Sequence, residues 1–497
     1  MINNLSNNTF LILGIVVSVA FVVLTRRRVR LVANPNRLPT PPGPKPLPVV
    51  GNIMDIPREK ESETYYKLAQ EYGPLVFLQV LGRNILVVND YETANELFEK
   101  RGTNYSDRNE LPMINDLMGW DWSFGHMPYG PRWKAHRTMF HRQFQSSVVS
   151  AFWPVQLKET HKLIRRLLAD PGDFINHLRY NSASTIMNVI YGIEIADEDD
   201  HYITVAETAL DGMAKAAHPG AFLVDIFPIL KHVPSWFPFA GFKRQAAYWR
   251  QSVIEMRNAP YEAVRSALKA GGASPCFVAN LLGDIELKAK DSTERREAET
   301  ETLRNCAGLA YAAGAESSVS ALSSFLLAMI LHPDAQAKAR EELDAVIGPS
   351  RLPDFNDRGS LPYIDALVKE TLRWSPVAPL GLPHMATKDD EFRGYHIPAG
   401  TTIMGNTWTI LHDPLIYPEP MTFKPERFLS REAAVTDPVN VAFGYGRRIC
   451  PGRFMAEAQL WISIACILHS FHVGQGKDER GGIIPVRPEF ASGMIWC

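Results

Sequence analysis

The sequence contains few cysteines, almost no net charge and no long low-complexity segment. The five cysteines among 497 residues are widely spaced and odd in number, which excludes a disulfide framework and the paired spacing of a zinc site. Lys and Arg total 52 against 54 Asp and Glu, a net charge of −2, so we expect no nucleic-acid partner. The 33 glycines and 36 prolines exclude a collagen-like chain. A large, nearly neutral globular enzyme or receptor with reduced thiols remains.

Charged residues are also absent from residues 10–24, an apolar run near the N-terminus. A comfortable membrane span needs about 20 residues, so the predicted transmembrane anchor includes the flanks and covers residues 9–25. Arg26, Arg27, Arg28 and Arg30 follow it directly, and the positive-inside rule then places residues 1–8 in the lumen and the rest of the chain in the cytosol. A cleaved signal peptide is the alternative, but here the basic residues follow the apolar run and no small-residue cleavage site precedes them.

Two further features accompany the predicted anchor. Asn4 and Asn7 each begin an N-x-Ser/Thr sequon on the predicted lumenal side, where glycosylation takes place. Residues 26–48 are basic and then rich in proline, which predicts a stiff, extended linker. Residues 49–497 form the predicted globular domain.

Helical periodicity dominates the globular part from Tyr91 onward. Before it, the apolar runs 75–80 and 84–88 predict a small hairpin sheet. The longest predicted helix covers about residues 298–332 and is stopped by Pro333. Because no internal repeat or glycine-rich linker divides the chain, we predict one large domain, mainly α with a minor β part.

Two segments of this domain stand out by their composition. The middle of the long helix, residues 309–315, is uncharged and rich in alanine. Small side chains let a bulky group lie flat against a helix, although close helix packing is the commoner cause. Residues 220–242 are apolar but broken by prolines, so they cannot span a membrane. Their aromatic residues could enter the membrane interface, line a lid or belong to a buried loop.

The strongest functional pattern lies near the C-terminus. Residues 443–452 match F-x-x-G-x-R-x-C-x-G at every fixed position. This segment resembles the cysteine loop of the cytochrome P450 family of haem-thiolate monooxygenases. The resemblance implies the cytochrome P450 fold with a long central helix, haem b (iron protoporphyrin IX) as cofactor, and residues 49–497 as the catalytic domain. It also implies that Cys450 is the axial ligand of the haem iron and that the other fixed positions bind the cofactor: Phe443, Gly446, Arg448 and Gly452.

A thiolate ligand makes chemical sense at Cys450. We expect the backbone N–H groups at the start of the following helix to lower the pKa of the thiol. Gly446 and Gly452 would let the backbone approach a flat macrocycle, and Arg448 would pair with a haem propionate. Thiolate ligation pushes electron density towards iron and favours cleavage of the O–O bond. A lone cysteine is more often a buried core thiol, the interpretation that we keep for the others.

A second pattern supports the same resemblance. Glu370 and Arg373 form E-x-x-R, about one helical turn apart, and Arg427 follows in a P-E-R-F segment. E-x-x-R alone is common on surface helices, but this order ahead of the cysteine loop is typical of the family. There the three residues form a structural charge network.

Further positions resemble the family's partners of the haem propionates. Trp133 and Arg137 form W-x-x-x-R, on one helix face at i and i+4. His384 stands where the family usually has another partner, although a lone histidine is more often an ordinary core or surface residue. Arg108 is a weaker candidate for the same role.

The centre of the long helix departs from the family pattern. Where the family has (Ala/Gly)-Gly-x-(Asp/Glu)-Thr, this chain has Ala313, Gly314, Ala315, Glu316 and Ser317. The resemblance implies that Gly314 opens space for dioxygen, that Glu316 relays protons and that the Ser317 hydroxyl orients oxygen and water. Ser317 lacks the methyl group that stiffens threonine. We therefore expect proton delivery to remain and its coupling to oxygen chemistry to loosen.

By this resemblance the protein inserts one oxygen atom of O2 into a hydrophobic small molecule, using electrons from NADPH that arrive through NADPH–cytochrome P450 reductase. Residues 372–384 are most similar to membrane-bound fungal members of the family that act in secondary metabolism. This similarity implies that the substrate is a terpenoid, sterol or polyketide. It also implies that the protein lies at the endoplasmic reticulum membrane, in contact with membrane lipid. The family's reductase is acidic where it docks, so we expect a basic docking face. Its candidates are Lys134, His136, Arg142 and Arg447.

Two alternatives stay open within the haem-binding interpretation. One is a non-catalytic or truncated haem-binding protein, because the chain ends abruptly beside its relatives. The other is a haem-thiolate isomerase that needs no reductase, a class that tends to lose the hydroxyl retained in Ser317. The substrate pocket is expected at aliphatic and small residues, namely Met113, Ile114, Tyr311, Ala312, residues 377–382 and residues 492–494.

Overall fold

The structure is a computed structural model of the chain. The predicted lumenal residues 1–8, the predicted anchor 9–25 and both sequons lie outside the residues that it describes. The described residues are 33–196, 200–218, 220–288, 292–429, 436–478, 480–490 and 493.

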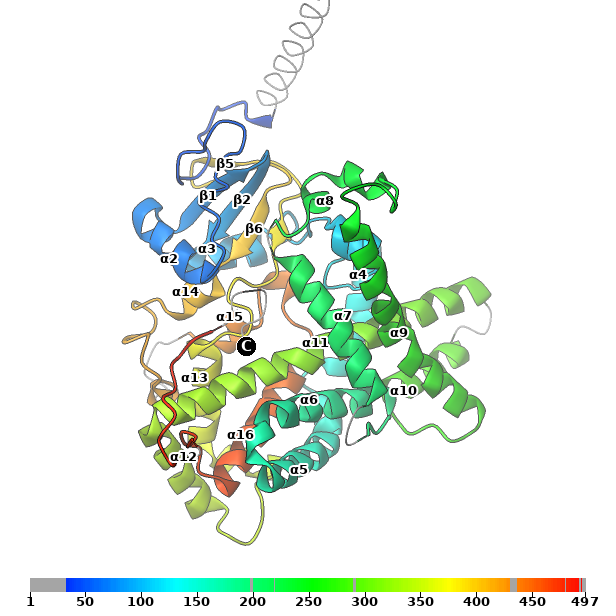
Figure 1. The fold of residues 1–497 in the computed structure, drawn as a ribbon, viewed down its shortest axis with the longest axis vertical. Coiled ribbons are helices and arrows are strands. Elements are labelled where there is room, and N and C mark those ends of the chain that lie inside the picture. The colour runs from blue at the N-terminus through cyan, green and yellow to red at the C-terminus, as the bar shows by residue number, and fades with distance from the viewer. Residues whose placement is uncertain are drawn as a thin grey trace, which may run out of the picture.

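A small sheet forms one end of the molecule and contains the predicted hairpin (Figure 1). β1 (Leu75–Val80) and β2 (Arg83–Val88) pair antiparallel. Leu81 and Gly82 between them both have positive φ, which matches the right-handed twist of two strands joined by a tight turn. The other strands are β6 (Thr402–Gly405), parallel to β2, β3 (His384–Met385), antiparallel to β6, and the separate pair β4 (Asp390–Phe392) and β5 (Tyr395–Ile397).

Helices make up most of the remainder, so the prediction of a mainly α fold with a minor β part is confirmed. They pack around one long central helix, α11 (Figure 1). The α-helices are α2 (Glu61–Tyr72), α3 (Tyr91–Ala94), α4 (Pro131–Phe144), α5 (Trp153–Ala169), α6 (Phe174–Tyr191), α7 (His201–Ala217), α8 (Leu223–Ile226), α9 (Gly241–Lys269), α10 (Phe277–Lys288), α11 (Thr293–Leu331), α12 (Pro333–Val346), α13 (Pro362–Trp374), α14 (Thr407–Leu411), α15 (Val439–Ala442) and α16 (Arg453–Ser470). Shorter 3-10 or π turns are η1 (Asn95–Lys100), η2 (Met113–Leu117), η3 (Val149–Phe152), η4 (Pro171–Asp173), η5 (Pro228–His232), η6 (Phe355–Ser360), η7 (Pro425–Phe428) and η8 (Gly446–Arg448).

The central helix α11 is longer than its sequence pattern predicts. It begins earlier because Ser292 caps it, accepting a hydrogen bond from the N–H of Arg295 at 3.3 Å. It ends at Leu331, and Pro333 opens α12, where the missing N–H of proline is no loss. Its 39 residues extend about 58 Å. One continuous helix therefore contributes residues to the core along the length of the domain.

The same helix has the length and apolar composition of a membrane span, and it is the one such helix among the described residues. In its most apolar stretch 50% is buried inside the molecule. Core helices of globular proteins meet the same criteria, so α11 is explained by its place in the core.

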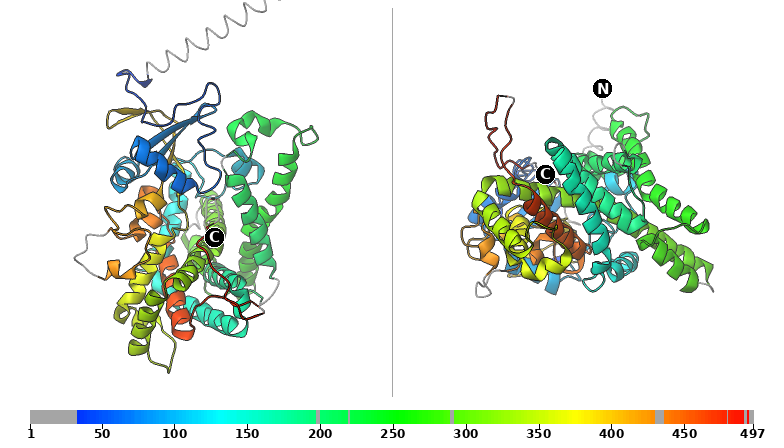
Figure 2. Two further views of the ribbon diagram at one scale, coloured as in Figure 1. Left: turned by 60° about the vertical axis from the view of Figure 1, so that its left-hand side comes forward. Right: turned by 90° about the horizontal axis from the view of Figure 1, so that it is seen from below.

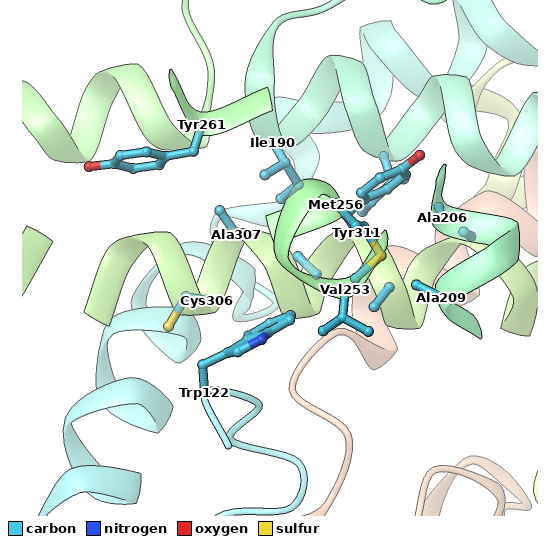
Figure 3. Packing of buried hydrophobic residues seen from close by; sticks show 14 of the residues in the cluster. Trp122, Ile190, Ala206, Ala209, Val253, Met256, Tyr261, Cys306, Ala307 and Tyr311 are labelled. Carbon is cyan, nitrogen blue, oxygen red and sulfur yellow. The ribbon is translucent and has the colours of Figure 1, made fainter. Parts of the chain in front are cut away.

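The largest apolar core lies where α11 meets α6, α7 and α9. Figure 3 shows side chains from these helices converging, among them Ile190 of α6, Val253 and Met256 of α9, and Ala307 and Tyr311 of α11. All five are almost completely buried. A second core joins the C-terminal half of α11 to α12, α13 and α16. The two cores thus hold successive parts of α11, the first up to Ala315 and the second from Val319 onward.

The segment that links α7 to α9 contains the short turns α8 and η5 and exposes its apolar side chains. Trp236 is 79% exposed and Phe239 is 97% exposed, which excludes the alternative of a buried loop. Two views place this segment and the sheet at the same end of the molecule (Figures 1 and 2). The described chain also begins at this end (Figure 1).

Candidate active site

A cavity of about 800 Å³ lies inside the molecule between α4, α6, α7, α11 and α16. Cys450 borders it from the loop before α16, and Glu316 and Ser317 border it from the middle of α11. Most of the remaining wall consists of aliphatic and aromatic side chains. The fold therefore brings the two strongest sequence patterns, distant along the chain, to one enclosed space of the size of a ligand site.

The loop that carries Cys450 connects α15 to α16. The N–H of Cys450 donates a hydrogen bond to the carbonyl of Phe443 at 2.8 Å, and Gly452 is the N-cap of α16. The sulfur therefore lies at the start of a helix, where unpaired N–H groups concentrate partial positive charge.

The electrostatics of Cys450 differ in part from the sequence expectation. Burial raises the pKa of its thiol, while the N–H groups of Gly452 and Arg453 and the guanidinium groups of Arg137 and Arg453 oppose that rise. The N–H groups thus lower the pKa of the thiol as expected, but the effect of burial is larger, and the pKa of the free thiol is raised. A metal cation at the sulfur would itself select the thiolate.

The glycines of this loop serve different contacts. Gly452 lines the cavity with open space beside it. Gly446 has a φ of +54°, and a Cβ there would collide with the carbonyl oxygen of Phe98 in η1. Its close backbone approach is thus to η1, whereas the sequence expectation placed it at a flat macrocycle. Gly444, which the motif leaves variable, does line the cavity and has a φ of +84°.

Three arginines border the cavity beside Cys450 without forming an ion pair among the described residues, although the charge of Asp107 acts on Arg108 and Arg448. Arg448 donates to the carbonyls of Ser106 and Met127 at 2.8 and 2.7 Å. Arg108 donates to carbonyls of residues 125, 382 and 383, and Arg137 donates to that of Ile449 at 2.7 Å. Burial, together with the charge of Arg137, lowers the pKa of Arg448 to about 10. This concentration of positive charge calls for an anionic ligand.

Aromatic groups complete this basic side of the cavity. The guanidinium of Arg448 lies 4.5 Å from the centre of the Trp133 ring, a cation–π contact. His384 is buried, and its Nδ1 lies 2.6 Å from the carbonyl oxygen of Tyr105. Burial and the charges of Arg108 and Arg448 hold the pKa of His384 well below its usual range. A neutral imidazole with one free nitrogen thus faces the same space as the arginines.

Glu316 and Ser317, which also line the cavity, occupy consecutive positions of α11. Ser317 donates a hydrogen bond from its hydroxyl to the carbonyl of Ala313 at 2.8 Å, the usual bond to the preceding turn. Burial raises the pKa of Glu316, the charge of Arg179 opposes the rise, and Glu207 adds to it. A carboxyl whose pKa is raised by burial is suited to carry a proton.

The predicted charge network lies apart from this cavity. Glu370 bonds Arg373 through both carboxylate oxygens at 2.7 and 2.8 Å, and its oxygens accept from Nε of Arg427 at 3.1 and 3.2 Å. All three side chains are buried. The remaining guanidinium donors bind carbonyls of the 411–422 segment. The network therefore ties α13 to the chain that leads into the cysteine loop.

The other expected pocket positions divide between wall and core. Met113 and Ile114 are fully buried and belong to the apolar core. Tyr311 borders a small separate cavity. Ser492 and Met494 lie outside the described residues. The expected positions that line the large cavity are Ala312, Val377, Ala378, Leu380, Gly381, Leu382 and Gly493.

One expected docking residue is in the wrong place for that role. His136 is 3% exposed, with Nδ1 2.8 Å from the carbonyl of Arg132 and Nε2 3.0 Å from the amide nitrogen of Asn305. It faces inward because α4 packs this side against α11. The other three candidates, Lys134, Arg142 and Arg447, are exposed.

Several polar wall residues carry no sequence signal. They come from a loop, from α6 and from the α7 region, and only the tertiary packing brings them to the cavity. A lone charged residue on an amphipathic helix is ordinarily a solvated one, so no motif marks them. They are His126, Arg179, Glu207, Asp211 and His218.

Comparison with known proteins identifies the family. The family model for cytochrome P450 matches residues 41–485. The chain belongs to the cytochrome P450 family. A cytochrome P450 monooxygenase of Armillaria gallica is 40% identical to it over 97% of this chain and 94% of its own length. The cytochrome P450 monooxygenase 98 of Postia placenta is 41% identical over 96% and 90%, and the tryptamine 4-monooxygenase of Psilocybe cyanescens is 37% identical over 98% and 95%.

As a cytochrome P450, the protein is a monooxygenase of the oxidoreductase class with haem as its cofactor, and the cavity residues fit that group. Haem carries two carboxylates, and three arginines that form no ion pair among the described residues border the cavity. A single thiol at a helix start suits a metal whose equatorial ligands come from a macrocycle. Small residues of α11, Ala312 to Gly314, leave room for its flat face.

Proposed function

We propose that this cytochrome P450 inserts one oxygen atom of O2 into a hydrophobic small molecule, with electrons from NADPH delivered by NADPH–cytochrome P450 reductase. The observation that carries the proposal is the common cavity of Cys450, the three arginines and the Glu316–Ser317 pair. A ligand-binding thiol and a proton-carrying group that border one cavity are what oxygen activation requires.

The basic side of the cavity would hold the cofactor. Cys450 binds the iron as thiolate, and the helix-start N–H groups stabilise its negative charge. Arg108, Arg137 and Arg448 bind the two haem carboxylates, with Trp133 and His384 as further partners. When bound, the haem supplies the redox chemistry of dioxygen.

The α11 side would supply protons. Glu316 takes up a proton and passes it inward, because burial raises the pKa of its carboxyl and so favours the protonated form. Ser317 donates or accepts through its hydroxyl, which can rotate away from the Ala313 carbonyl. Serine retains the function of the family's threonine with a less restricted side chain.

The substrate class follows from the character of the cavity wall. Leu210, Met213, Leu309, Val377 and Leu380 line it with small residues between them, which supports a terpenoid, sterol or polyketide of secondary metabolism. One relative is named for 4-monooxygenation of tryptamine, so an aromatic amine belongs in the same screen. Apolar contacts bind such molecules and exclude bulk water.

We place the protein at the endoplasmic reticulum membrane, with residues 9–25 as the anchor. Residues 1–8 would lie in the lumen and be glycosylated at Asn4 or Asn7. The catalytic domain from residue 49 would lie in the cytosol. The exposed apolar segment around Trp236 supports this orientation, because it lies at the end where the described chain begins. Lys134, Arg142 and Arg447 are exposed and are our candidates for docking an acidic reductase.

The deciding experiment is the absorption spectrum of the reduced, carbon-monoxide-bound protein. We expect a red-shifted Soret band typical of thiolate ligation, its loss in Cys450→Ala, and its retention in Cys276→Ala, a control at another buried cysteine. A band typical of neutral ligation in the unmodified protein, or loss of the band in both variants, would contradict the assignment of Cys450.

The isomerase and non-catalytic alternatives make a different prediction. A monooxygenase consumes NADPH and O2 only when the reductase is present, and product appears with incorporated oxygen. Turnover of a peroxide without reductase would favour the isomerase, and an intact thiolate band without turnover over a broad substrate screen would favour the non-catalytic protein.

A further inference from the structure

A polar stripe on α6 follows the proton-carrying part of α11. Arg179, Ser182 and Thr185 are spaced at intervals of three residues, so they share one face of the helix. All three line the large cavity, together with Glu316 and Ser317. Because the side chain of Ile186 on α6 also packs against Gly314, this part of α6 lies beside the centre of α11.

Each residue of this stripe has one buried polar atom without a partner in the described part of the chain, although Nη1 of Arg179 donates a hydrogen bond to Oδ1 of Asn176 at 3.3 Å. Nε of Arg179, the hydroxyl of Ser182 and the hydroxyl of Thr185 are buried atoms without a hydrogen-bond partner among the described residues. The buried polar groups of folded proteins are paired, and where the protein supplies no partner, ordered water does. The stripe is therefore a hydrated surface in the interior.

A second cavity continues the stripe towards the outside. It measures about 10 Å³ and is bordered by Arg179, Glu207, Leu210, Ala315 and Glu316, among others, which is room for about one water molecule. Glu207 belongs to both cavities and is exposed. Polar groups thus extend from solvent at α7 to the carboxyl group of Glu316.

The charges along this path act on Glu316 in opposite directions. Arg179 of α6 lowers its pKa and Glu207 of α7 raises it, against a background of burial that also raises it. Asp211 and His218 border the large cavity farther along, and Tyr311 of α11 borders the small one while donating to the carbonyl of Tyr202 at 2.8 Å.

We propose that Arg179, Ser182, Thr185 and Glu207 form the route by which protons from solvent reach Glu316. The inference rests on the proposed role of Glu316 and extends it outward. A proton leaves bulk water at Glu207, moves through water held by the stripe and binds the Glu316 carboxylate. Arg179 stays protonated throughout and orients the water and the carboxylate. These four are positioning residues, and no electron moves in this step.

The first test measures Glu316 directly in the oxidised resting protein. Infrared difference spectra follow its carboxylic acid band against pH, and Glu316→Gln identifies the band. We expect Arg179→Gln to shift the titration of Glu316 upward and Glu207→Gln to shift it downward. Asp211→Asn is the matched charge control. Asp211 lies one helical turn farther on α7, is exposed and pairs with Lys215 at 2.7 Å. We expect Asp211→Asn to shift the titration of Glu316 less than Arg179→Gln or Glu207→Gln does.

The second test measures the route itself. After rapid mixing into D2O, the same band shifts as the Glu316 proton exchanges. We expect the Ser182→Ala, Thr185→Val double variant to slow this exchange severalfold while leaving the titration midpoint in place, because only the water-holding hydroxyls are removed. Asp211→Asn should exchange at the original rate.

Two results would overturn the proposal. One is a shift of the Glu316 titration in the same direction, or no shift, in the Arg179 and Glu207 variants. The other is unchanged exchange in the double variant. The carbon-monoxide spectrum of each variant separates this failure from a failure of the proposed function, since an intact thiolate band shows that fold and ligation are retained.

Discussion

At the scale of single residues, the buried arginines fall into two groups, those that pair with a carboxylate and those that do not. Arg373 and Arg427 share the carboxylate of Glu370, so their charge is largely compensated inside the protein. The hydrogen bonds that Arg108 and Arg448 donate go to carbonyl oxygens, and neither guanidinium forms an ion pair among the described residues. A compensated cluster fixes the scaffold, whereas an uncompensated one supplies binding energy to an anionic ligand.

The compensated cluster allows a test by substitution. Glu370→Gln keeps the size of the side chain and leaves two buried guanidinium groups without a counter-charge. We expect a loss of about 3–5 kcal/mol in the free energy of unfolding, the usual cost of breaking a buried ion pair, measured by urea denaturation of the haem-loaded protein.

Glu299→Gln is the control, because it breaks an i, i+4 pair with Arg295 at 2.8 Å on the outer part of α11. Such a pair is worth about 0.3–0.5 kcal/mol. Equal losses in the two variants would show that burial of the Glu370 network does not matter to stability.

At the scale of elements, the fold depends on close contacts between helices. α7 and α9 meet where Gly212 faces the ring of Trp249. A Cβ added to Gly212 would lie 2.6 Å from the nearest ring atom. Since α7 also carries Glu207 and part of the cavity wall, this contact sets the position of one side of the active site.

Gly212→Ala should therefore separate two helices, although alanine favours helix formation. We expect a loss of about 1–3 kcal/mol, typical of overpacking, seen as a lower Tm. Gly283→Ala is the matched control within α10, where a Cβ meets nothing within 4 Å, and should gain about 0.5–1 kcal/mol from helix propensity. A stabilising Gly212→Ala would contradict the observed packing.

At the scale of the whole molecule, exposed apolar side chains gather at the end that contains the sheet. They come from residues 47–54, ahead of β1, and from residues 223–239, between α7 and α9. Met54 is 80% exposed and Ile229 is 74% exposed. Apolar exposure on two separate segments at one end is typical of a surface that contacts lipid.

A chain that begins at residue 33 should consequently still bind lipid vesicles. We expect Trp236→Ser with Phe239→Ser to reduce the bound fraction in a flotation assay, because both side chains would lose apolar transfer energy. Leu415→Ser removes another exposed apolar side chain, 92% exposed, outside both segments and should leave binding unchanged. Equal binding by all three chains would exclude this orientation.

Prediction from sequence worked where the signal is local. The hairpin of β1 and β2, the long helix and the motif residues of the cysteine loop follow from short patterns, because strand alternation, helix periodicity and a tight loop each involve neighbouring residues. The start of α11 was missed because Ser292 caps it before the apolar pattern begins. His136 was misplaced because its helix turns that face towards Asn305.

The sequence alone determined the family and the cofactor, and it is the source of our proposal that Cys450 binds the iron, because five fixed positions that include Cys450 encode one loop geometry. The tertiary structure alone decided what surrounds that chemistry. Arg179 and Glu207 lie on separate helices and approach Glu316 only when α6 and α7 pack beside α11. Their contacts are long-range in sequence and depend on how helix faces fit together, which no local pattern specifies.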